Sequence, residues 1–159
     1  MKKYRPTTPS RRHTKTVTYR GVLTASEPNK ALTKGVKRSV GRNSAGRITV
    51  RHKGGGHKRL YRDIDFVYNK YDIPAKVETI EYDPNRSGFI ALVVYKDGER
   101  RYVLVPSSVK VDDVFVVSEK AEIKVGNRTT LKKIPSGTLV YNIELKPSNK
   151  IADLCIKWD

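Results

Sequence analysis

Side chains that can bind an anion are concentrated in one stretch of this sequence. Residues 41–62 read GRNSAGRITVRHKGGGHKRLYR and hold seven Lys or Arg, two His and five Gly, with no Asp or Glu. Arg and Lys bind phosphate groups, and glycine lets backbone N–H groups approach an anion closely. A phosphate-binding loop, a metal site, a basic tail and a clamp on a nucleic-acid backbone are the chemistries to weigh.

Nucleotide hydrolysis does not fit the spacing. The phosphate loop of nucleotide hydrolases needs GxxxxGK followed by Ser or Thr, set between a strand and a helix. Here the glycines Gly54–Gly56 are followed by HKR, and no helical pattern comes after them.

Metal binding and acid–base catalysis fit no better. Zinc takes four ligands, whereas His52 and His57 stand among cations and the one thiol, Cys155, is far away. We interpret these His as phosphate donors or base-stacking groups. Asp63 and Asp65 alternate with apolar residues, as in a strand surface or in ion pairs with neighbouring Arg. No catalytic residue, metal or cofactor is predicted.

The charge of the chain is strongly asymmetric. The 159 residues carry a formal net charge of +17, yet residues 1–70 hold 19 Lys or Arg against three acids, and the remainder is close to neutral. Such a polycationic half predicts a polyanionic partner. No apolar run is long enough to span a bilayer and no secretion signal is apparent, and a single cysteine fits a reducing compartment.

The elements that must position the cations are predicted to be short strands. Residues 1–40 show little apolar periodicity, with one weak strand candidate at 19–26. Another lies at 48–52, and 53–59 is a loop. From residue 60 onward, short alternating or apolar segments are separated by the turn signatures DPNRSG and KDGE. The predicted strands are 60–70, 75–83, 89–95, 100–106, 108–118 and 121–126, which indicates an all-β barrel or sandwich.

Two details of this pattern can be checked in a structure. Alternation through 75–83 places Val77 and Ile80 on opposite faces. Tyr61, Phe66 and Tyr68 could stack on bases, although strand spacing requires some of them to lie in the core.

RNA is the favoured polyanion. A solubilising basic tail would not need apolar residues such as Ile48 and Leu60 between its cations. No recognition helix is predicted that could enter the major groove of DNA, whereas small β-barrels bind RNA through faces, loops and stacking. A non-specific nucleic-acid chaperone and a phosphate-processing enzyme remain as alternative functions.

The segment 41–62 followed by RDIDF resembles the signature segment of the bacterial large-subunit ribosomal protein L two family. KKYRPTTPSRR, LTKGVKRSVGRN, VETIEYDPNRSGFIALVVYKDGERRYVLVP and IPSGTLVYNIELKP resemble that family in the same order, over roughly residues 2–147. The resemblance implies three parts: a basic RNA-binding extension (1–59), a five-stranded OB-fold barrel (60–120) and an SH3-like barrel that begins at 121–159. The strand count from 60 to 118 agrees with the OB-fold barrel.

The resemblance also implies a function and a location. The family binds large-subunit ribosomal RNA in the cytoplasmic ribosome, among neighbouring ribosomal proteins, and supports assembly, subunit association and the peptidyl-transferase region without supplying its chemistry. Carried over by motif, the RNA-binding residues are Arg42, Asn43, Arg47, Arg51, His52, Lys53, Gly54, Gly55, Gly56, His57, Lys58, Arg59 and Arg62. Further contacts in the extension are Lys2, Lys3, Arg11, Arg12, Lys37 and Arg38.

After NIELKP the sequence departs from the family, whose members continue for much longer. The SNKIADLCIKWD ending predicts a C-terminally truncated SH3-like barrel. A frame change, a split gene whose second chain completes the C-terminal half, and a reduced form are equally compatible with it.

Overall fold

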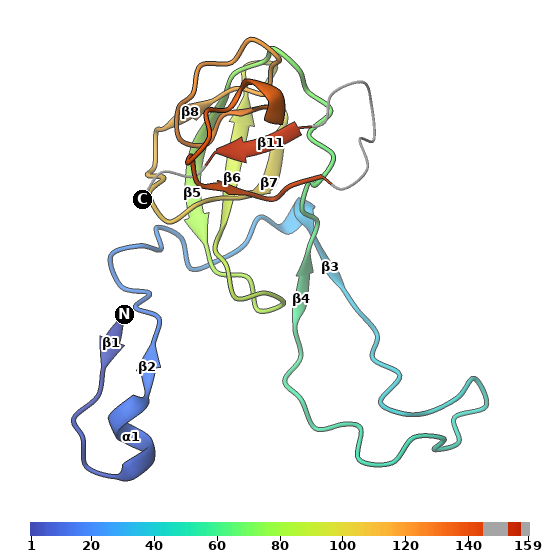
Figure 1. Cartoon of the computed structure of the whole chain (residues 1–159). Coiled ribbons are helices and arrows are strands. Elements are labelled where there is room, and N and C mark those ends of the chain that lie inside the picture. The colour runs from blue at the N-terminus through green and yellow to red at the C-terminus, as the bar shows by residue number, and fades with distance from the viewer. Residues whose placement is uncertain (145–152, 157–159) are drawn as a thin grey trace.

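The main unit of the computed structural model is a curled, four-stranded antiparallel sheet, which resembles half of a barrel (Figure 1). The structure describes residues 1–144 and 153–156. In spatial order the sheet contains β7 (Arg100–Leu104), β6 (Ile90–Tyr95), β5 (Ala75–Glu81) and β8 (Val114–Phe115). The predicted all-β class is therefore confirmed as a mostly β chain. Its helical elements are short: α1 (Pro9–His13) and the 3-10 helices η1 (Lys30–Leu32) and η2 (Leu131–Lys133).

The apolar run FIALVVY forms the central strand β6 because both faces of that strand are buried. Val93 and Tyr95 lie in the main hydrophobic core. Ile90 and Leu92 lie in a second, smaller cluster with Tyr102. The predicted Asp-Gly hairpin joins β6 to β7, and Gly98 adopts a φ of 86° at its turn.

A β-bulge in β5 overturns the alternation predicted for 75–83. The register with β6 shifts between Val77 and Thr79, because the bulge inserts one residue. Ile80, which was predicted to lie on the face opposite Val77, therefore joins Val77 in the main core. The next residue, Glu81, is buried as well. Strict alternation fails here because it assumes an unbroken pleat.

Closure into a five-stranded barrel is not confirmed. Within the predicted strand 108–118 only β8 forms, and 121–126 contains no strand. A second sheet has the order β10-β11-β9, formed by β10 (Val140–Tyr141), β11 (Asp153–Ile156) and β9 (Arg128–Thr130). Val125 and Tyr141 of the segment predicted as a separate barrel pack against the main core. The rest of that segment, 145–152 and 157–159, lies outside the described residues.

Two projections extend from the sheets (Figure 1). The N-terminal hairpin pairs β1 (Lys2–Lys3) with β2 (Lys15–Thr16) and carries α1 at its turn. The arm begins with the ribbon of β3 (Thr33–Gly35) and β4 (Leu60–Arg62), and residues 36–59 form its long loop. The loop predicted at 53–59 is confirmed. The strand candidates at 19–26 and 48–52 are wrong, since they make only isolated contacts, such as the bridge between Arg42 and Ile48.

The arm is attached to the outer face of the sheet. Leu32, just before β3, packs on the second cluster with Ile64, which follows β4. The N–H of Asp65 donates to the carbonyl of Tyr102 at 2.8 Å. Upstream, Thr24 bonds to Ile80 at the free edge of β5, where its hydroxyl accepts from the Ile80 N–H at 2.9 Å.

A buried hydroxyl completes the attachment. The Tyr102 hydroxyl accepts from the Asn29 N–H at 2.7 Å and donates to the Glu81 carboxyl at 2.7 Å. Burial, reinforced by the bond to Glu81, raises the pKa of this hydroxyl, so it keeps the proton that it donates. Tyr102 thereby joins the start of the arm to the bulged end of β5.

We expect Tyr102→Phe to lower the free energy of unfolding by about 1–3 kcal/mol, because the buried Glu81 carboxylate and the partly buried Asn29 N–H lose their partner. Chemical denaturation measures the loss, and hydrogen exchange should speed up at the Asn29 amide. Tyr82→Phe is the matched control, because the Tyr82 side chain is exposed. Equal stabilities for the two variants would refute the proposed attachment.

Candidate nucleic-acid interface

The tip of the arm is an ordered double turn. The Asn43 N–H donates to the Arg47 carbonyl at 2.9 Å, and the Arg47 N–H donates to the Asn43 side chain at 2.9 Å. Both Thr49 and Val50 donate their N–H groups to the Gly41 carbonyl, at 2.9 and 3.1 Å. Asn43 therefore stabilises the turn with both its backbone N–H and its side-chain oxygen, as Asn side chains often do in turns.

Gly41 is a required glycine. Its φ is +74°, and a Cβ added there would lie 2.2 Å from the Val50 carbonyl oxygen. Next to it Val40 adopts a φ of 44°, and His52 adopts 57° on the other side of the tip. Positive φ is costly for a β-branched residue, and such strain is found preferentially at functional sites.

The glycine-rich side of the loop offers unused backbone donors. Within the described part of the chain, no backbone N–H of residues 51–59 donates a hydrogen bond. Gly54 and Gly55 have φ values of 148° and 67°, and a Cβ added at either would meet nothing within 4 Å. These N–H groups can therefore approach an anion directly, as in backbone anion nests.

The cations of this loop are not neutralised by the protein itself. Residues 36–59 contain eight Lys or Arg and no acid. None of these cations makes an ion pair with any of the residues that the structure describes. Their unpaired charges are the main feature that the loop offers to a polyanion.

The structure brings the predicted contact residues into two places. All of them are exposed except Arg62, which is 8% exposed and donates to the Leu60 carbonyl at 2.8 Å. Arg62 is buried because it lies at the base of the arm, where β4 reaches the sheet, whereas Leu60 and Tyr61 of the same strand are exposed. The remaining positions between 37 and 59 share the arm, and Lys2, Lys3, Arg11 and Arg12 share the N-terminal hairpin.

An aromatic ring organises the cations of the N-terminal hairpin. Lys2 Nζ lies 5.2 Å and Arg11 Cζ 5.4 Å from the ring centroid of Tyr4. Pro9 begins α1, and the Thr8 hydroxyl caps it by accepting from the Arg11 N–H. Sequence analysis missed Tyr4, although an aromatic residue among cations was a usable signal.

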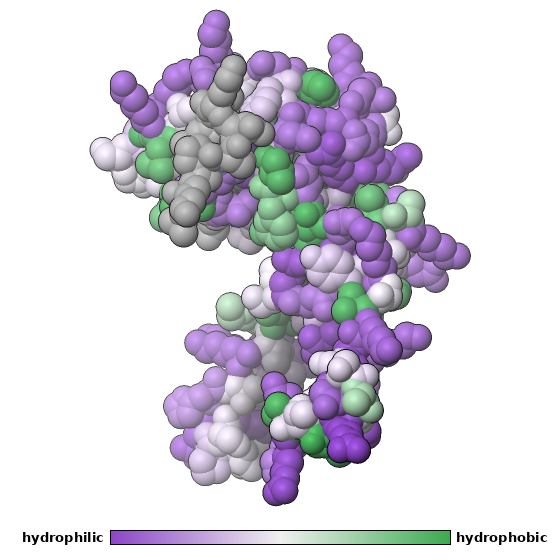
Figure 2. Space-filling view, turned by 90° about the vertical axis from the view of Figure 1, so that its right-hand side faces the viewer, coloured by the Kyte–Doolittle hydropathy of each residue, from purple (hydrophilic) through white to green (hydrophobic). Residues whose placement is uncertain are grey.

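Figure 2 shows the resulting distribution on one face: below a narrow waist, hydrophilic side chains dominate, with isolated hydrophobic ones between them.

Of the three aromatics predicted as stacking candidates, Tyr68 is in the core, whereas Tyr61 and Phe66 are exposed. Phe66 is exposed because the chain leaves strand geometry after Ile64, and the Asp65 side chain accepts the N–H groups of Val67 and Tyr68.

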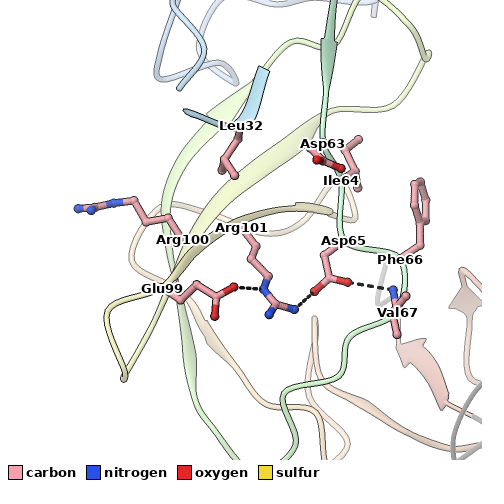
Figure 3. Close-up of a pocket in the computed structure, with 9 residues that line it drawn as sticks. All are labelled: Leu32, Asp63, Ile64, Asp65, Phe66, Val67, Glu99, Arg100 and Arg101. Atoms are coloured by element: carbon pink, nitrogen blue, oxygen red, sulfur yellow. Dashed lines mark hydrogen bonds and ion pairs between the residues drawn. The ribbon is translucent and has the colours of Figure 1, made fainter. Parts of the chain in front are cut away.

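A cleft of about 420 Å³ beside Phe66 has the opposite character (Figure 3). Of its three acids, Asp65 and Glu99 are held by Arg101, at 2.7 and 2.6 Å. The Arg101 guanidinium, with Lys70, holds the pKa of Glu99 below its usual range. Three carboxylates line this cleft against two guanidinium groups, so it suits a polyanion less well than the acid-free arm does.

Within residues 1–144 and 153–156, no helix is long and apolar enough to cross a membrane. The same residues contain no group of three or more His, Cys, Asp or Glu side chains placed to hold a metal ion.

A curled β-sheet that carries an exposed, acid-free cationic arm has the features expected of a β-protein that binds polyanions. Residues 29–118 match the family described as ribosomal proteins L2, RNA-binding N-terminal domain. The matched range begins at Asn29, just before the arm, and includes the arm and the main sheet. The match covers more than half of the chain. The chain therefore belongs to the ribosomal protein L2 family, as its sequence resemblance predicted.

We expect Gly41→Ala to disorder the tip, because its Cβ cannot fit beside the Val50 carbonyl. Hydrogen exchange at the Thr49 and Val50 amides should accelerate, while the main sheet stays protected. Gly46→Ala is the matched control, since Gly46 has a φ of +78° but open space around it. It should show only positive-φ strain, about 1–2 kcal/mol. If the two variants exchange alike, the close approach at Gly41 is not what orders the tip.

Proposed function

We propose that this protein is a structural component of the large ribosomal subunit and binds large-subunit ribosomal RNA through its arm. The observation that carries the proposal is the exposed loop 36–59, with eight unpaired cations, no acid and free backbone N–H groups. Membership in a ribosomal family whose matched domain binds RNA supports it. The proposed contacts are the predicted residues without Arg62, which is buried.

The proposed mechanism is neutralisation of RNA phosphate charge by cations that the fold holds in place. The ordered tip and the ribbon hold the cations at defined positions, so they can follow the irregular surface of a folded RNA. Binding then releases condensed counterions and depends steeply on salt. The sheet holds the arm in place and supplies no chemistry, so the protein acts in assembly and in support of the RNA rather than as an enzyme.

We further propose that the half-barrel belongs to an OB-fold domain and that the second sheet begins an SH3-like barrel. The antiparallel β5–β6–β7 meander and the bulge in β5 support the first assignment, since bulges curl sheets toward closure. In this reading the N-terminal hairpin is a second RNA contact. The ribosome is the proposed location, with neighbouring ribosomal proteins as further partners.

Salt dependence tests the proposed clamp. If about eight phosphates are neutralised, the log–log slope of affinity against salt should be near −6, at roughly 0.7 per phosphate. Replacing four arm cations with Ala should flatten this slope by about 3 and weaken binding, because four phosphate contacts are lost. The four are Arg51, Lys53, Lys58 and Arg59.

The matched control removes the same charge elsewhere. It replaces four exposed lysines of the near-neutral half with Ala: Lys96, Lys110, Lys120 and Lys132. Its slope should stay close to that of the wild type. Equal flattening in both quadruple variants would show that net charge, and not the arm, determines binding.

Competition separates the proposal from a non-specific chaperone. Large-subunit ribosomal RNA should displace a labelled ribosomal RNA fragment at lower concentration than an unrelated RNA of equal length does. Equal displacement would favour the chaperone.

A further inference from the structure

The junction between the arm and the sheet contains a pocket in which residues of the proposed clamp meet an aromatic ring and a side-chain amide. Its volume is about 320 Å³, at the lower end of the roughly 300–1,000 Å³ typical of small-ligand sites. It lies beside the loop between β5 and β6, at the place where that loop approaches β4 (Figure 1). Its lining residues are Val36, Arg38, Gly56, Arg59, Tyr61 and Asn85.

We propose that this pocket binds one unstacked base of the RNA that the arm holds. The proposal rests on the proposed function and adds to it a mode of recognition. RNA-binding proteins commonly capture a splayed-out base by stacking it on an aromatic ring or a guanidinium plane and by hydrogen bonds to its edge. Each of these parts is present in the pocket.

Tyr61 supplies the aromatic surface. It lies in β4, and its side chain is 40% exposed. The ribbon register places it opposite Lys34. Lys34 is itself paired with Asp63 at 2.7 Å, so the cation next to Tyr61 is already partnered. The ring is therefore available for stacking.

Arg38 supplies a guanidinium that the protein has already oriented. Its Nη1 donates to the carbonyls of Gly56 and His57, at 2.6 and 3.2 Å. A Cβ added at Gly56 would lie 2.6 Å from Arg38 Nη2, so a glycine is needed for the guanidinium to take this position. The Nε and Nη2 donors make no hydrogen bond with the described residues and remain free for a base edge or its phosphate.

Asn85 supplies an amide that can read a base edge. Its Nδ2 donates to the Leu60 carbonyl and to Asp83 Oδ1, both at 3.1 Å, which fixes the side chain. Its Oδ1 accepts no hydrogen bond from the described residues. An amide oxygen of this kind accepts from the exocyclic amino groups of bases.

The mixture of groups favours a base over a lone phosphate. A phosphate would gain nothing from Tyr61 and from the exposed Val36, which give the pocket an apolar side. Arg59 adds a second cation to the lining, which can bind the phosphate next to a captured base. The cleft beside Phe66 also has an exposed aromatic residue, but its carboxylates disfavour RNA.

The test uses the full chain and a fragment of large-subunit ribosomal RNA in which one unpaired adenine is replaced by fluorescent 2-aminopurine. Stacking of the base on Tyr61 should quench its fluorescence. Tyr61→Leu should weaken binding about 5- to 100-fold and abolish the quenching, from the magnitudes of base–aromatic stacking. The log–log salt slope should stay unchanged, because no charge is removed.

Two variants keep the test specific. Tyr61→Phe preserves the ring and should bind within about 2-fold of the wild type. Phe66→Leu removes an equally exposed aromatic residue from the acidic cleft and should leave binding and quenching unchanged. Arg38→Lys keeps the charge and should reduce quenching at an unchanged slope, because an ammonium lacks the planar fork. Thermal unfolding of each variant confirms that it folds.

The outcomes distinguish the two proposals. If the wild type binds with a steep salt slope and Tyr61→Leu binds and quenches in the same way, the base pocket is overturned and the clamp stands. If the wild type binds none of the RNA, the proposed function falls, and the pocket falls with it. Loss of binding in Phe66→Leu as well would also overturn the pocket, since stacking would not be specific to Tyr61.

Discussion

The hydroxyl of Tyr102 is the interaction on which the relation between sheet and arm depends. It is buried in the second cluster, and it bonds on one side to the backbone of Asn29 and on the other to Glu81. Glu81 faces it only because the bulge in β5 changes the phase of that strand. A local irregularity of the sheet thus determines where the arm starts, and a buried polar pair that must stay satisfied keeps it there.

The sheet and the arm also differ in how their charged side chains are paired. In the sheet, acids and cations pair with each other, as in Arg101 with Asp65 and Glu99, or Arg86 with the buried Asp83. These pairs use up the charge of the sheet. The arm has no acids with which to pair. The excess charge of the chain is therefore presented outside the sheet, on the arm and the N-terminal hairpin, where a polyanion can neutralise it.

The arm combines freedom and constraint along its length. Gly41 and Asn43 give the tip a fixed double turn, whereas Gly54 and Gly55 leave their backbone open to solvent. The root is fixed again, because Arg38 bonds across the loop to Gly56 and Asn85 bonds to Leu60. An ordered root and tip reduce the conformational entropy that binding must remove, which is the benefit of preorganisation.

The sequence alone determined the β class, the family, the cationic loop and the Asp-Gly hairpin, because charge, glycine content and turn signatures are local properties. It could not show that Arg62 is buried, that Tyr68 lies in the core or that Ile80 shares a face with Val77. Those outcomes depend on a bulge and on the point where β4 ends. The pocket between Arg38, Tyr61 and Asn85 was equally hidden, because only tertiary structure brings the arm root beside the β5–β6 loop.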